Sequence, residues 1–114
     1  MPFRWGSNDC CTFAAACVDA LTDSNWTADL AKHYWDKRSA LAYIADCGGV
    51  AAGATARLGE PIPVLQARRG DVCLVETPMG YGLAVCLGAS VVIPGSRGLI
   101  TKPLSEVHMA WRVG

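Results

Sequence analysis

The sequence predicts an α+β fold, in which N-terminal helices pack on a small antiparallel β-sheet. The first half of the chain repeats apolar residues at helical spacing, and the second half has short apolar runs separated by turns rich in Gly and Pro. The 114 residues are 52% hydrophobic and 18% charged, which is typical of a well-packed globule and not of a disordered chain. This length suits one core, so we expect a single domain over residues 1–114.

Four helices are expected in the first half. The first covers 10–21 and has Asn8 or Asp9 as a suitable N-cap. One stripe of this helix carries Phe13, Cys17, Val18 and Leu21. The other three are expected at about 27–34, with Thr27 as the cap, at 37–47 and at 50–58. Glycines at 48–49 and 59 mark the ends of the last two helices.

Five strands are expected in the second half, after a spacer at 60–63 that contains two prolines. Their predicted ranges are 71–76, 82–87, 91–93, 99–101 and 109–113, with a helical turn at 104–107. The run 82–87 is nearly all apolar, which predicts a central strand buried on both faces.

Charge and hydropathy exclude several classes of function. Ten basic and ten acidic side chains give a net charge of zero, so nothing indicates electrostatic binding of nucleic acid or of an anionic membrane. No apolar run is long enough to span a bilayer, and the N-terminus has no signal-peptide pattern.

The six cysteines are expected to be reduced thiols, mostly in the core. No export signal indicates an oxidising compartment, and none of the cysteines forms the paired spacing of a zinc site. We therefore expect no cofactor and no metal. A metal or iron–sulfur binder is an alternative that the cysteine count alone suggests, and the absence of close clusters disfavours it.

The stretch Trp-Gly-Ser-Asn-Asp-Cys-Cys at 5–11 contains the candidate reactive cysteine. A polar loop that ends in Asp-Cys before an apolar helix places a thiol in the first helical turn, where free N–H groups and the helix dipole favour a thiolate. Cys10 is therefore the candidate nucleophile. Cys11 would take its place only if the register shifted by one residue. Asp9 is expected to act as an N-cap and Asp71 to bond local backbone at a turn, and neither is expected to catalyse.

A helix opened by Asp-Cys, then more helix, then a Gly-Asp-led strand and a small antiparallel sheet resembles the NlpC-type cell-wall peptidases, whose fold is papain-like. The resemblance implies that Cys10 occupies the nucleophile position. It also implies that 69–75 matches the family's Pro-Gly-Asp-Leu strand and that 82–88 matches its His-Val-Gly-Ile-Tyr-Leu-Gly strand.

A fuller match covers nearly the whole chain. The opening Trp-Gly-x-x-Asp-Cys-Cys-x-Phe-Ala-Ala at 5–15 and the closing Ala-Trp-Arg-Val at 110–113 resemble a family of small uncharacterised proteins from the tail gene clusters of phages and prophages. In those clusters a protein of this fold often stands beside the tail-tip hub. The resemblance implies partners among hub or tail-tip subunits and a place in the virion tail, after synthesis in the cytoplasm of the bacterial host.

The chain departs from the peptidase pattern at the general base. The base His of the peptidases would fall at Gly82, and their third polar residue would fall within the apolar stretch 91–93. A thiol without a base is only slightly ionised at neutral pH, and turnover suffers. The chain has two histidines: His33 is expected on the surface, and His108, before the last strand, is the one candidate for a base from an unexpected position.

Surface aromatic residues are the candidates for binding a partner. The chain has four tryptophans, and Trp and Arg are enriched in interface hot spots. Trp35 beside Tyr34, and Trp111 beside Arg112, are the predicted contacts, with core packing as the alternative. The basic pair Arg68-Arg69 is expected to be a solvated loop.

The sequence thus predicts a structural or assembly component of a phage tail tip that keeps a peptidase fold without the full catalytic set, that is, a pseudoenzyme. The alternative is an active cysteine hydrolase that cleaves the stem peptides of bacterial peptidoglycan during genome entry. It would use Cys10 as the nucleophile and take its base from an unexpected position or from a partner chain.

Overall fold

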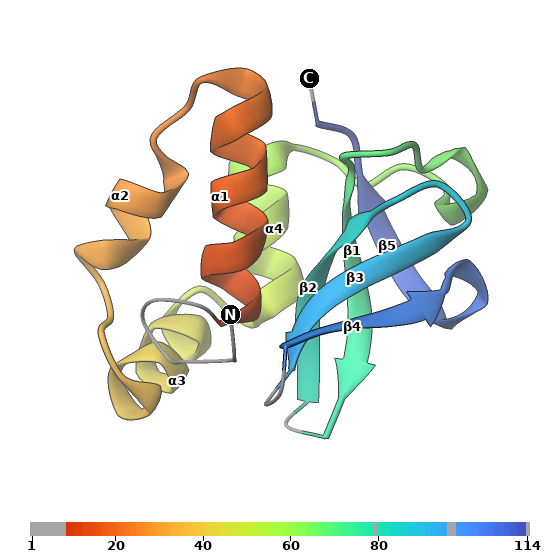
Figure 1. Ribbon diagram of the computed structural model, residues 1–114. Helices are drawn as coiled ribbons and strands as arrows, with labels where there is room; N and C mark the ends of the chain where they lie inside the picture. Colours follow the sequence, from red (N-terminus) through yellow and green to blue (C-terminus); the bar gives the residue numbers. More distant parts are fainter. Residues whose placement is uncertain (1–8, 79, 96–97, 114) are drawn as a thin grey trace.

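The computed structural model describes residues 9–78, 80–95 and 98–113. Its helices are α1 (Cys10–Thr22), α2 (Trp26–Ala31), α3 (Lys37–Asp46) and α4 (Val50–Leu58), with 3-10 turns η1 (Val64–Gln66) and η2 (Leu104–Glu106). Its strands are β1 (Val72–Thr77), β2 (Gly80–Cys86), β3 (Ser90–Gly95), β4 (Gly98–Pro103) and β5 (Val107–Trp111). The four helices lie on one side of the sheet (Figure 1), which confirms the predicted α+β class.

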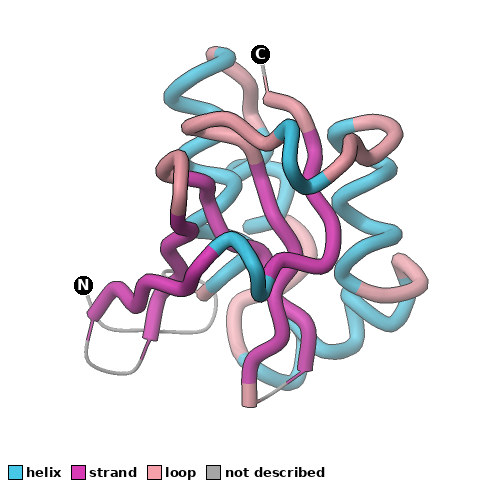
Figure 2. The backbone as a smooth tube through the Cα atoms, turned by 90° about the vertical axis from the view of Figure 1, so that its right-hand side faces the viewer, coloured by secondary structure: helices cyan, strands magenta, loops and turns pink. Residues whose placement is uncertain are grey.

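The sheet is antiparallel throughout, with strand order β4-β3-β2-β1-β5. In the view of Figure 2 the strands cross in front of the helices. β2 is the middle strand, and its residues from Gly82 to Cys86 are buried, as the apolar run predicted. The two outer strands are β4 and β5, and Ile62 covers part of β5 by donating its N–H to the Ala110 carbonyl, 2.8 Å away.

α1 and α4 lie against the sheet, and α2 packs on α1. The face of α1 toward this core carries Ala14, Ala15 and Val18, at most 4% exposed. The predicted stripe was therefore wrong at its end, because Leu21 is 61% exposed. Leu21 lies near the C-terminal end of α1, and a methyl group of its side chain contacts Gly70 instead of the core. A Cβ added to Gly70 would stand 2.8 Å from Leu21 Cδ1.

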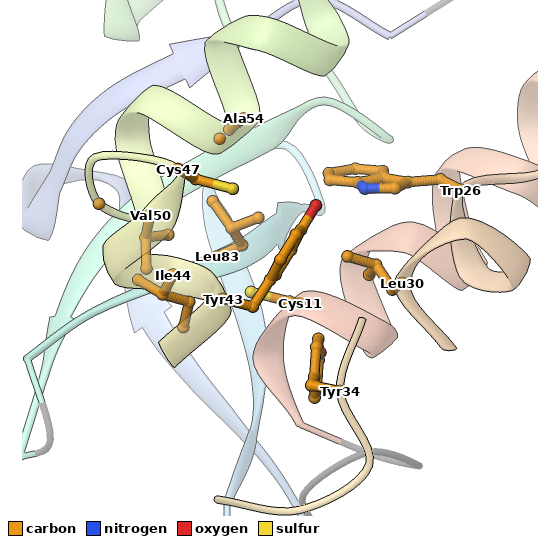
Figure 3. Close-up of a pocket in the computed structure, with 12 residues that line it drawn as sticks. Cys11, Trp26, Leu30, Tyr34, Tyr43, Ile44, Cys47, Val50, Ala54 and Leu83 are labelled. Carbon is orange, nitrogen blue, oxygen red and sulfur yellow. The ribbon is translucent and has the colours of Figure 1, made fainter. Parts of the chain in front are cut away.

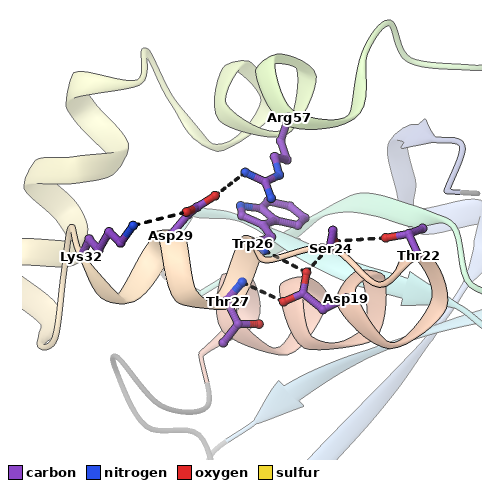
Figure 4. A network of polar contacts seen from close by, with 8 residues as sticks. All are labelled: Asp19, Thr22, Ser24, Trp26, Thr27, Asp29, Lys32 and Arg57. Carbon is purple, nitrogen blue, oxygen red and sulfur yellow. Dashed lines mark hydrogen bonds and ion pairs between the residues drawn. The ribbon is translucent and has the colours of Figure 1, made fainter.

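The second helix begins one residue earlier than predicted and ends at Ala31. Thr27 is not its cap. Asp19 of α1 takes that role, since its carboxylate accepts the backbone N–H groups of Trp26 and Thr27 at 2.9 Å each (Figure 4). Ser24 also donates to Asp19, at 2.6 Å. A cap supplied from another helix leaves no local sequence signal, which explains the wrong boundary.

The other face of the sheet has its own apolar cluster, and Cys10, at the start of α1, also packs against it. It contains Cys73, Val75, Ala84, Cys86, Val91, Ile93 and Ala110. Ile62, Ala67 and Leu104, from the segments around η1 and η2, pack over it. Both faces of the central strands are therefore covered.

Asp71 directly precedes β1, at the end of this strand that lies opposite the β1–β2 hairpin. Its buried carboxylate accepts the Arg68 N–H at 2.9 Å and the Val113 N–H at 3.0 Å, and it also accepts from Arg112 Nε at 3.3 Å. The expected turn role of Asp71 is confirmed, and the same carboxylate also fixes the end of the chain.

No helix of the described chain combines the length and the apolar character that crossing a membrane requires.

Candidate functional site

Asp9 places the thiol of Cys10 at the start of α1, in a capping box that confirms the predicted N-cap. The Asp9 carboxylate accepts the Thr12 N–H at 2.9 Å, and the Asp9 N–H donates to Thr12 Oγ1 at 2.9 Å. Tyr34, which follows α2, donates its hydroxyl to the same carboxylate at 2.8 Å. Asp9 is 1% exposed, so this buried polar group fixes Cys10 in place.

The sheet opens between β2 and β3 beside Cys10. The two strands pair only at Val85–Val92 and Cys86–Val91. If this register continued, Leu83 would face Pro94, and proline has no N–H to donate. The Leu83 carbonyl would lack a donor at such a pair, and the ladder ends before it. The backbone N–H of Leu83 is hydrogen-bonded to the Cys10 sulfur.

The pKa of Cys10 lies below its ordinary value. The main cause is the hydrogen bond that the Cys11 S–H donates to the Cys10 sulfur, and the Leu83 N–H adds to it. Burial and the negative charge of Asp9 act in the opposite direction. The pKa of Cys11 is raised well above its ordinary value because that hydrogen bond holds its proton, and burial adds to the effect. Cys10 is therefore the thiol of this pair that ionises.

Gly82 lies directly against the Cys10 sulfur. A Cβ added to Gly82 would stand 3.2 Å from Cys10 Sγ, and 3.3 Å from both Ile93 Cδ1 and Thr77 Cγ2. The position to which the resemblance assigns a base is thus in contact with the thiol, but it carries no side chain. The neighbour on β3, where the pattern has a third polar residue, is an isoleucine.

His108 lies on β5, which β1 separates from β2, with roughly 10 Å between the two strands. His108 sits at an irregularity in β5, because Leu74 pairs with Met109 while Val75 pairs with Val107. Its exposed ring packs edge-on against Tyr81, with 5.4 Å between the ring centroids.

The other histidine is exposed, as expected. The ring of His33 stacks on Tyr43, with 4.5 Å between centroids and 17° between planes. Each of the two histidine rings therefore packs on a tyrosine.

The three predicted partner contacts have different environments. Trp35 is 69% exposed. Trp111 is fully buried and donates its indole N–H to Thr55 Oγ1 at 3.0 Å, so its ring is a core element and not a surface anchor. The guanidinium of Arg112 binds Asp71 and donates to the Gln66 carbonyl at 2.9 Å, so it is engaged within the chain.

All six cysteines are free thiols, of which Cys73 and Cys86 are buried and the other four are half-buried. Cys11 and Cys47 line a small cavity between the helices, together with Tyr43 (Figure 3). The cavity volume is about 40 Å³, which is far below the size of a substrate pocket. No group of three or more His, Cys, Asp or Glu in the described ranges is arranged to hold a metal ion.

The sequence indicated the candidate thiol but not the opening in the sheet. A signal was present, because Pro94 directly follows the predicted strand at 91–93 and a proline removes a ladder donor. The contribution of Leu83 had no signal, since it comes from the backbone.

The comparisons with known proteins identify a family whose description names no function. No curated protein and no solved structure matches the chain. The family model for a domain of unknown function, DUF6950, matches residues 1–113, so the chain belongs to this family.

Proposed function

We propose that this protein is a structural component of a phage or prophage tail tip, built on a papain-like, NlpC-type fold that does not hydrolyse peptides. Its surfaces would dock onto hub or tail-tip subunits, and it would be made in the cytoplasm of the bacterial host and carried in the virion tail. The fold assignment is supported by the element order, with a cysteine at the start of the first helix and an antiparallel sheet after the helices.

One observation carries the non-hydrolytic part of the proposal: Gly82 occupies the place beside Cys10 where a base is needed. Peptide cleavage by a cysteine requires a group that takes the thiol proton and returns a proton to the leaving amine. The hydrogen bonds from Cys11 and Leu83 favour the thiolate, so removal of the thiol proton needs less help from a base. Position 82 has no side chain that could return a proton to the leaving amine. An acyl-enzyme would therefore not form from an amide at a useful rate.

The tail-tip part of the proposal is supported by the resemblance of the opening and closing motifs to phage tail-cluster proteins. An exposed Trp35 on a chain of zero net charge is consistent with a protein that works by surface contact.

A cysteine hydrolase that acts on peptidoglycan stem peptides is the second candidate. The lowered pKa of Cys10 favours it, since perturbed thiols are common at active sites. In this case the base would come from an unexpected position, such as His108, or from a partner chain.

The test uses a phage whose genome encodes this protein. We expect the protein in purified tails by mass spectrometry, and we expect phage with Cys10→Ser to assemble and infect as the wild type does. Loss of infection with normal assembly would favour the hydrolase. Absence of the protein from purified tails would contradict the tail assignment.

A further inference from the structure

The loop between α2 and α3 presents an exposed tryptophan among positive charges. We define the Trp35 surface as Lys32, Trp35, Lys37 and Arg38. All four side chains are exposed, Trp35 at 69% and the Lys32 side chain at 75%. Leu41, 48% exposed, lies one helical turn after Lys37 and shares its side of α3.

The loop that carries Trp35 is fixed on both sides. Ser39 Oγ accepts the backbone N–H groups of Trp35 and Asp36, at 3.0 and 3.2 Å. Tyr34, the preceding residue, is buried and donates to Asp9 at 2.8 Å. The indole therefore projects from a rigid base, so ordering it on binding requires little backbone entropy.

Two features of this surface are unfavourable for the isolated chain. A large indole is left in water, although burial would stabilise it. Lys37 and Arg38 lie in the first turn of α3, which has no acidic residue, and the helix dipole there disfavours positive charge. Local violations of this kind are expected where a surface is kept for binding.

The charges of the segment 32–38 indicate that its partner is acidic. The segment 32–38 has three basic residues and one acidic residue, in a chain whose ten basic and ten acidic side chains balance. The acidic one, Asp36, already caps α3 by accepting the Ser39 N–H at 2.9 Å. Lys32 Nζ lies 3.9 Å from Asp29 Oδ1 in an exposed ion pair. Carboxylates of a partner would therefore chiefly neutralise Lys37 and Arg38, and they would also suit the helix N-terminus.

We propose that the Trp35 surface docks onto an acidic surface of a partner protein, in which carboxylates border an apolar depression that accepts the indole. Taking that partner to be another tail protein rests on the proposed function, but the binding itself does not. Three cations are few for a duplex or an anionic bilayer, both of which are bound through broader basic surfaces.

The test titrates the purified, isotope-labelled chain with a helical peptide that carries Glu and Leu on one face, and follows the amide and indole signals by NMR. We expect shifts confined to 32–41 and binding that weakens with salt. The Lys37→Glu/Arg38→Glu variant and the Trp35→Ala variant are each expected to lose roughly tenfold in affinity.

The matched control is Arg68→Glu/Arg69→Glu, which reverses an exposed basic pair without an aromatic neighbour and is expected to retain the affinity. The proposal is overturned by absence of binding, by an equal loss in the control, or by tighter binding of duplex DNA or phosphatidylglycerol vesicles than of the peptide. Peptide binding by a protein that is absent from tails would overturn only the tail assignment.

Discussion

Cys10 and Gly82 are in contact across the junction of α1 and β2, and a Cβ on Gly82 would stand 3.2 Å from Cys10 Sγ. The contact is possible because position 82 has no side chain and because Pro94 ends the β2–β3 ladder next to it. A thiol with a lowered pKa and a residue without a side chain thus meet at one point. The relation between these two residues underlies the first two predictions.

Gly82→Ala is expected to destabilise the fold by about 1 kcal/mol, because the new methyl group would crowd Cys10, Ile93 and Thr77. Cys10→Ala alone makes room at that point. The double variant is therefore expected to be more stable than the sum of the two single changes indicates. Denaturant unfolding of the four proteins measures this coupling, and strictly additive changes would contradict the contact.

Cys10 is expected to react with iodoacetamide ahead of the other five thiols at neutral pH. Its pKa is lowered by Cys11 and Leu83, whereas burial raises the pKa of Cys73 to about 12 and also raises that of Cys17. Cys11→Ala removes the S–H donor, so the pKa of Cys10 is expected to rise. Mass spectrometry across pH measures the rate at each thiol. A pH profile of Cys10 that does not move in Cys11→Ala would exclude the thiol–thiol hydrogen bond.

Trp35 and Trp111, each predicted from the sequence to contact a partner, are expected to differ in their effect on stability. Trp111→Ala leaves a core cavity and an unpaired Thr55 hydroxyl, so a loss of about 3–5 kcal/mol is expected. Trp35→Ala removes an exposed ring and is expected to change stability by less than about 0.5 kcal/mol. Chemical unfolding compares them, and similar losses would show that Trp35 packs against the fold.

Asp19 is expected to make the contact between α1 and α2 sensitive to acid. Its pKa is lowered from 3.8 to about 2; burial opposes the shift, and hydrogen bonds from Ser24, Thr27 and Trp26 outweigh it. Because the folded pKa is the lower one, the carboxylate contributes its stability above pH 3.8 and loses it as the pH falls toward 2.

Asp19→Asn is the variant that tests this assignment, with Asp23→Asn, at the exposed C-cap of the same helix, as the control. We expect Asp19→Asn to be less stable at neutral pH and to show a weaker dependence on pH in the acid range. An unchanged acid profile would exclude Asp19 as the capping group.

The sequence predicted the fold class and most of the elements because their signals are local. Asp9 and the glycines after α3 and α4 mark helix ends, and the apolar run in β2 marks a central strand. The start of α2 was missed because its cap comes from Asp19, seven residues before Trp26. The exposure of Leu21 was missed because periodicity gives the direction of a side chain but not where the sheet beneath it ends.

The residues of the candidate site could be predicted from the sequence, but their contact could not. Cys10 follows from a local motif, and the vacancy at Gly82 follows from a resemblance in the strand pattern. That the two are in contact depends on the packing of α1 across the opening beside β2, which no local pattern carries. The place of His108 on β5, two strands from β2, likewise depends on the strand order.

The central claim is that Cys10 is an ionisable thiol in a site that does not cleave peptides. The most direct test incubates the purified protein with peptidoglycan stem peptides and with whole sacculi, and measures newly released amino groups by mass spectrometry against Cys10→Ser. We predict the same background for both proteins. Release of amines that depends on Cys10 would contradict the account and would require a base that position 82 does not supply.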